Sequence, residues 1–149
     1  MIYWFTGQPG AGKTVLANKL SYFMVGYTHQ LAFPIDGDQM RDLFVNKDYS
    51  IKGRVANIDA AQKISHYLHN ENKLVIVSLV SPYLDQREEF KQLIGTDIME
   101  IYVHTSNIRG REHYHVKGYQ PPLNNFIDVD TTIDTPEESL QKIITQIKK

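Results

Sequence analysis

The clearest chemical signal in the sequence is a glycine-rich segment near its start. Residues 7–14 match the phosphate-loop pattern GxxxxGK[ST] at every fixed position, and they are Gly7, Gln8, Pro9, Gly10, Ala11, Gly12, Lys13 and Thr14. Glycines let backbone N–H groups approach phosphate oxygens, the lysine reaches the β- and γ-phosphates, and the next hydroxyl holds Mg²⁺. We therefore expect all eight residues to bind ATP, with Lys13 catalytic and Thr14 a magnesium ligand.

A pair of carboxylates is the second candidate. Asp36 and Asp38 flank Gly37, directly after a short apolar run. Many ATPases and GTPases instead place a magnesium-holding aspartate after their most apolar strand, but the run 73–80 has no carboxylate. One aspartate of the pair can orient or deprotonate an acceptor hydroxyl and the other can help to place the metal, although a helix cap also suits one of them. This arrangement favours a small-molecule kinase.

Further polar residues suit an anionic acceptor. Arg41 follows the aspartate pair by about one helical turn, and Arg54 and Asn57 have the i, i+3 spacing of one helix face. An arginine there can bind an anion, and an asparagine can read a base or ribose edge. For Arg54 taken singly, a solvated helix charge is the simpler interpretation. Ser81 and Pro82 end an apolar run with a hydroxyl and exposed backbone.

The remaining pattern predicts the elements that position these residues. Apolar runs predict strands over 2–6, 31–35, 73–80, 98–103 and 126–129. Helical periodicity predicts helices after Lys13, over 54–69, over 83–94, and from the N-cap Thr135 to about residue 146. Strands that alternate with helices indicate an α/β fold of three layers, a mainly parallel sheet with helices on both faces, as in P-loop kinases. Ligands then bind outside the carboxyl ends of the strands.

Composition limits the other functions. The chain of 149 residues suits a single domain over 1–149, and a net charge of −1 argues against a nucleic-acid partner. There is no cysteine, and no apolar run approaches the length of a membrane span. The first residues run straight into the phosphate loop without the features of a signal peptide. We expect a cytoplasmic protein with no membrane association.

A polar, aromatic and proline-broken segment over about residues 109–122 predicts a mobile lid. Arg109 and Arg111 can neutralise phosphoryl charge when a lid closes, as arginines do in many phosphoryl transfers. We assign Arg109 to the ATP site. Lys117, also in the lid, is assigned to the acceptor site.

Several further segments follow one another in a recognisable order. They are YWFTG at 3–7, IDGDQMR at 35–41, NKDYS at 46–50, Ser50 with Arg54, Asn57 and Ile58, SPY at 81–83 with Arg87, and GYQPP at 118–122. Through these segments, nearly the whole chain resembles the adenylylsulfate kinase (APS kinase) family. The chain would be a compact member with a shortened lid.

The resemblance implies a reaction and the roles of several residues. The γ-phosphoryl group of ATP would pass, with Mg²⁺, to the ribose 3′-hydroxyl of adenylyl sulfate (APS), giving ADP and the 3′-phosphorylated product PAPS. Asp36 and Asp38 would be catalytic acids, and Tyr49 would stack on the adenine of APS. The residues assigned to the acceptor are Asp38, Arg41, Tyr49, Arg54, Asn57, Ser81, Pro82 and Lys117. Family members commonly dimerise, so a homodimer is expected.

The chain also departs from the family pattern. Asp59 and Ala60 stand where the family has further arginines, and the family's lid phenylalanine has only Tyr114 and Tyr119 as candidate counterparts. A P-loop kinase with another nucleotide, a modified DNA base or a small alcohol as acceptor is the alternative. A non-catalytic nucleotide-binding protein is a third reading, against which the retention of the lysine and both aspartates argues.

Overall fold

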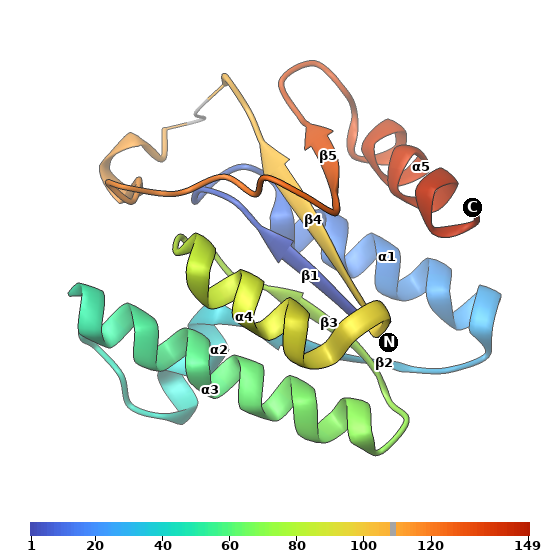
Figure 1. The fold of residues 1–149 in the computed structure, drawn as a ribbon. Helices are drawn as coiled ribbons and strands as arrows, with labels where there is room; N and C mark the ends of the chain where they lie inside the picture. The colour runs from blue at the N-terminus through green and yellow to red at the C-terminus, as the bar shows by residue number, and fades with distance from the viewer. Residues whose placement is uncertain (108–109) are drawn as a thin grey trace.

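The strands that the sequence predicts are present in the computed structural model, which describes residues 1–107 and 110–149 (Figure 1). They are β1 (Ile2–Thr6), β2 (Ala32–Asp36), β3 (Leu74–Ser78), β4 (Ile98–His104) and β5 (Phe126–Asp130). They form one sheet in the order β2-β3-β1-β4-β5, and every neighbouring pair is parallel. The predicted α/β class is therefore confirmed.

Helices cover both faces of this sheet. They are α1 (Lys13–Thr28), α2 (Gly37–Leu43), α3 (Ile51–Asn70), α4 (Leu84–Ile94) and α5 (Pro136–Ile147), with 3₁₀ turns at Gly95–Asp97 and Glu112–Tyr114. Figure 1 shows α1 and α5 on one face and α3 and α4 on the other. Ser50 caps α3, and Thr135 forms the predicted cap of α5 together with Glu138. None of the helices in the described ranges is both long and apolar enough to cross a bilayer.

The core has two layers because alternate residues of a strand point to opposite faces. In β1, Tyr3 and Phe5 pack in the cluster that includes α1 and α5, whereas Ile2 and Trp4 pack in the cluster that includes α3 and α4. All five residues of β1 and of β3 are buried. A strand that is covered on both faces reads as a continuous apolar run, which is why these strands were predictable.

The strand order also places the candidate residues. The phosphate loop follows β1, the aspartate pair follows β2, and Ser81 and Pro82 follow β3. Because β3 lies between β2 and β1 and all three are parallel, these three segments share one edge of the sheet. This is the edge at which ligands bind in open α/β sheets.

Candidate active site

The phosphate loop connects β1 to α1, lies against β4 and is bonded to Thr131, the residue that follows β5. Gly7 has φ +148°, and a Cβ built there would lie 2.0 Å from the carbonyl oxygen of Val103 in β4, so only glycine fits without a backbone shift. On its other side, the Thr131 hydroxyl donates to the carbonyl of Ala11 at 2.7 Å. The bond from Thr131 and the close approach to Val103 both restrain the loop.

Lys13 is the buried cation of this loop. Its side chain is only 8% exposed, and Nζ donates to the carbonyl of Gln8 at 2.8 Å. Burial lowers the pKa of Lys13 to about 8, while the nearby carboxylates of Asp36 and Asp38 act in the opposite direction. A buried ammonium group whose bonded partner here is a neutral carbonyl is well suited to a phosphate.

Thr14 lies where a hydroxyl ligand for Mg²⁺ is expected. Its Oγ1 is 3.4 Å from Oγ of Ser78, and Ser78 is paired in register with Asp36. These three residues and Asn18 border a small cavity of about 30 Å³. Hydroxyl and carboxylate oxygens are ligands that Mg²⁺ prefers, and the ion usually keeps several waters and binds substrate phosphates. The described chain has no cluster of three or more Asp, Glu, His or Cys side chains that could hold a metal.

The two aspartates have different local roles. Asp36 caps α2, because its Oδ1 accepts from the backbone N–H groups of Asp38 and Gln39 at 3.0 and 3.3 Å. The helix-cap interpretation is thus right for Asp36, whose orientation is fixed by the cap. Asp38 lies exposed in the first turn of α2. Both face the phosphate loop closely enough to act on Lys13.

Three of the predicted acceptor residues come together between α2 and α3. The guanidinium of Arg41 lies 3.9 Å from the centre of the Tyr49 ring, and that of Arg54 lies 5.9 Å from it. Nη1 of Arg41 donates to the carbonyls of Asn46 and Asp48, and Nε of Arg54 donates to the carbonyl of Tyr49 at 2.8 Å. Tyr49 is 61% exposed. One of its faces is already covered by Arg41.

Asn57 and Ser81 bring buried, unsatisfied polar atoms to the same edge. Nδ2 of Asn57 donates to the carbonyl of Gly37 at 3.4 Å, but its Oδ1 has no partner within residues 1–107 and 110–149. Oγ of Ser81 is likewise buried without a partner in the described chain. Buried polar groups are normally hydrogen-bonded, so these two atoms have hydrogen-bonding capacity that the described chain does not use. Pro82 is buried beside them, and its carbonyl accepts from the backbone N–H of Gln120 at 2.8 Å.

The lid residues are less uniform than the sequence suggests. Arg109 lies outside the described residues, and Lys117 is exposed. Tyr114 is 66% exposed, whereas Tyr119 shares a 2.8 Å hydrogen bond with the Thr6 hydroxyl. The ring of Tyr119 stacks on Tyr102, and burial raises the pKa of Tyr119 to about 12. Of the two candidate lid aromatics, Tyr114 is therefore the one with an exposed ring.

Sequence reasoning missed the contacts that attach the segment predicted to be a lid to the rest of the site. The Gln8 side chain points to the lid, where its Nε2 donates to the carbonyl of Val116 and its Oε1 accepts from the Val116 N–H, at 2.9 and 2.8 Å. Arg87 donates to the carbonyls of Ser81 and Gln120. Arg87 was visible as part of the SPYxxxR segment, but nothing local in the sequence indicates a partner 108 residues away from Gln8.

Comparisons with known proteins agree on one family. The family model for adenylylsulphate kinase matches residues 1–142. The adenylyl-sulfate kinase of Picosynechococcus sp. is 31% identical in an alignment of length 164. The alignment covers 97% of this chain and 91% of that protein. The adenylyl-sulfate kinase of Rippkaea orientalis is 30% identical and is covered to 90%, with 98% of this chain aligned.

Solved structures agree on the fold. A Mycobacterium tuberculosis APS kinase in complex with AMPPNP and APS superimposes with a TM-score of 0.81 at 21% identity, covering 99% of this chain and 97% of that chain. A gluconokinase from Sinorhizobium meliloti gives a TM-score of 0.68 at 14% identity, covering 99% of this chain and 90% of that chain. Kinases named for different acceptors thus share this architecture, so side chains rather than the fold must select the acceptor.

Proposed function

Because the chain belongs to the adenylylsulfate kinase family, we propose that it transfers the γ-phosphoryl group of ATP to the ribose 3′-hydroxyl of adenylyl sulfate, producing ADP and PAPS. The observation that carries this proposal is the composition of one sheet edge. It holds a buried phosphate-loop lysine, a pair of aspartates, and an arginine–tyrosine–arginine cluster beside unsatisfied polar atoms.

The donor side is assigned to the phosphate loop. The backbone N–H groups of residues 7–14 would surround the ATP phosphates, and Lys13 would exchange its bond to the Gln8 carbonyl for phosphate oxygens. Thr14 would hold Mg²⁺, with Ser78 behind it. When bound, Mg²⁺ would neutralise charge that develops on the transferring group. Arg109, which the sequence assigns to the ATP site, would also belong to the donor side.

The acceptor side is assigned to the cluster between α2 and α3 together with the turn after β3. Arg41 and Arg54 would bind the anionic part of adenylyl sulfate, and the exposed ring of Tyr49 would stack on its adenine. Asn57 and Ser81 would supply the hydrogen bonds that their buried atoms lack in the described chain. Pro82 would line this side, and Lys117 would approach it from the lid.

The transfer itself needs little covalent work from the protein. The 3′-hydroxyl oxygen forms a bond to the γ-phosphorus, the bond from that phosphorus to the β,γ-bridging oxygen breaks, and ADP leaves. The hydroxyl proton passes to a carboxylate of the Asp36–Asp38 pair. Asp36 is held in place by its cap, so it can orient the hydroxyl, and the exposed Asp38 can accept the proton or help to place the metal. Positioning and electrostatic stabilisation provide most of the rate.

An acceptor panel tests this function. Release of ADP from ATP would be measured with adenylyl sulfate, AMP, deoxynucleoside monophosphates, gluconate and duplex DNA, with Lys13→Ala as the matched control. We expect turnover with adenylyl sulfate and a loss of several orders of magnitude in Lys13→Ala at unchanged fold. Preference for another acceptor would contradict the proposed substrate, and near-normal turnover of Lys13→Ala would contradict the role of the loop.

Two further expectations remain proposals. Residues 109–122 would serve as the lid of a single domain over 1–149. The homodimer would be tested by light scattering on the purified protein at several concentrations.

A further inference from the structure

The second half of the lid is attached to the body of the protein at several points. Val116 is bonded to Gln8 of the phosphate loop, and Tyr119 to Thr6 at the end of β1. Gln120 then meets the turn after β3, because its N–H donates to the carbonyl of Pro82 and its Oε1 accepts from the N–H of Leu84, both at 2.8 Å. In contrast, residues 111–114 are exposed.

Arg87 is the centre of the attachment on the acceptor side. It projects from α4, is 2% exposed, and donates from three nitrogens to three different partners. Nε donates to Oε1 of Glu100 at 2.7 Å, Nη1 to the carbonyl of Ser81 at 2.5 Å, and Nη2 to the carbonyl of Gln120 at 2.6 Å. The rigid guanidinium fork thus fixes the turn after β3 and the lid relative to each other.

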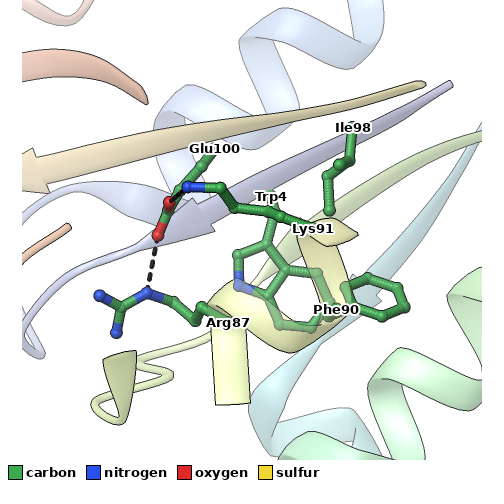
Figure 2. Close-up of a pocket in the computed structure, with 6 residues that line it drawn as sticks. All are labelled: Trp4, Arg87, Phe90, Lys91, Ile98 and Glu100. Atoms are coloured by element: carbon green, nitrogen blue, oxygen red, sulfur yellow. Dashed lines mark hydrogen bonds and ion pairs between the residues drawn. The ribbon is translucent and has the colours of Figure 1, made fainter. Parts of the chain in front are cut away.

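Glu100 pairs with this arginine, and Lys91 bonds the other oxygen of the same carboxylate. Figure 2 shows Arg87 and Lys91 converging on the carboxylate of Glu100, beside the indole of Trp4. Glu100 is 1% exposed, and its Oε2 accepts from Lys91 at 2.7 Å. Lys91 also donates to the carbonyl of Asn124. A buried charge is costly unless it is paired, so the bond to Oε1 of Glu100 commits Arg87 to one position.

The turn that Arg87 holds has an unfavourable backbone conformation. Ser81 has φ +49°, a left-handed value that is uncommon for residues other than glycine. Such conformations persist where the surroundings enforce them, and they cluster at functional sites. The same residue carries the buried Oγ that lacks a partner in the described ranges. Arg87 therefore enforces the backbone geometry at a point where the acceptor is expected to bind.

We propose that Arg87 is a positioning residue for the acceptor. It locks the left-handed turn at Ser81 and the lid at Gln120 into one unit, so that the acceptor site is complete only when both are held. The proposal rests on the proposed function for the identity of the acceptor, but not for the attachment itself.

The test compares two variants, each of which changes one of the two cations that bond Glu100. Arg87→Lys keeps a cation opposite Glu100 but cannot reach both carbonyls at once. Lys91→Met removes the other partner of Glu100 and leaves the Arg87 fork intact. Arg87→Lys should raise KM for adenylyl sulfate by at least about tenfold, because small displacements of positioning groups are costly, with KM for ATP within about twofold of the parent. Lys91→Met should leave both KM values near those of the parent.

Hydrogen exchange supplies a readout that does not depend on the acceptor. The Gln120 amide should exchange roughly tenfold faster in Arg87→Lys than in the parent, because its bond to Pro82 is part of the same unit. It should exchange at the parental rate in Lys91→Met. If adenylyl sulfate is not the acceptor, the proposed function fails. The exchange measurement still tests whether Arg87 holds the segment at Gln120.

Two results would overturn the proposal. One is an Arg87→Lys variant with parental KM values and parental exchange at Gln120. The other is equal loss of stability in both variants with KM for both substrates changed in parallel, which would make Arg87 only a support of the core. If Arg87→Lys does not fold, the parent protein decides the question. Saturating adenylyl sulfate should slow exchange of the Gln120 amide, because the acceptor and the attached Gln120 segment would stabilise each other. An unchanged exchange rate would refute the coupling.

Discussion

Lys13 shows how strongly one residue can be affected by its place in the fold. The phosphate loop holds its ammonium group in a buried position, facing a carbonyl, before any phosphate is present. Burial dominates the two nearby carboxylates, and the pKa falls to about 8 from 10.5. In the nucleotide-free protein this lysine is therefore a destabilising charge.

The pKa shift predicts a pH-dependent effect of Lys13→Met on stability. Between pH 8 and 10.5 the unfolded parent binds more protons at this residue than the folded parent, so the unfolding free energy of the parent rises with pH through that window. Without nucleotide and in EDTA, Lys13→Met should be more stable than the parent by on the order of 3 kcal/mol at pH 7. This advantage should vanish towards pH 10.5. Urea unfolding at three pH values measures it, and a constant difference would refute the cause.

Tyr49 provides the second prediction for a single residue. Its ring is exposed and stacked by Arg41, so its loss should affect the acceptor more than the core. Tyr49→Leu should raise the Kd of adenylyl sulfate about tenfold, the equivalent of about 1.4 kcal/mol, whereas Tyr49→Phe should behave like the parent. Calorimetric titration measures both variants. If Tyr49→Leu instead lowers the melting temperature and leaves the Kd unchanged, the ring stabilises the fold and does not bind the acceptor.

Among the helices and strands, local signals decided what could be predicted. The buried strands are continuous apolar runs and the long helices have apolar periodicity, and the positions of these elements follow from the two patterns. In α2, only Met40 is buried, and the helix depends on the Asp36 cap. The sequence therefore has no apolar stripe there from which this helix could be predicted. The phosphate loop was predictable because its residues are consecutive. The bonds from Gln8 to Val116 and from Arg87 to Gln120 were not, since pairs so distant in sequence leave no local pattern.

The close contact between α3 and the preceding loop predicts a matched pair of glycine variants. A Cβ at Gly53 would lie 2.1 Å from the carbonyl oxygen of Asp48, so the loop that carries Tyr49 and anchors Arg41 would have to move. Gly53→Ala should cost about 1–3 kcal/mol and raise KM for adenylyl sulfate, with KM for ATP unchanged. At Gly26 in α1 a Cβ meets nothing within 4 Å, so Gly26→Ala should be neutral or stabilising. Equal behaviour of the two would contradict this account.

For the whole molecule, the two apolar layers lie on opposite faces of the sheet. The cluster with α1 and α5 includes Ile143, which is fully buried on α5. Ile133, between β5 and α5, is 92% exposed and touches no such layer. The overall architecture could be predicted from the order of elements, but the sequence did not show which apolar residue belongs to which layer until the sheet order was known.

This separation gives a further prediction. Ile143→Ala should lower the free energy of unfolding by about 2–5 kcal/mol, the usual cost of a cavity in a core, and leave KM for both substrates unchanged at a temperature where it is folded. Ile133→Ala is the control and should have the stability of the parent. Urea unfolding and steady-state kinetics check both variants. A KM change in Ile143→Ala would show that the α5 layer influences the site.

The sequence contains one tryptophan, Trp4, and the structure places it two residues before the end of the strand that leads into the phosphate loop. Its indole packs on Phe90 with 5.4 Å between the ring centres, is 2% exposed, and borders the same small cavity as Arg87 and Glu100. Under excitation selective for tryptophan, fluorescence of the unlabelled protein therefore comes from a single indole that borders the same cavity as the charged network of Arg87, Lys91 and Glu100. The emission should respond to rearrangement of that network, which would let the timing of acceptor binding be followed by stopped flow without any attached dye.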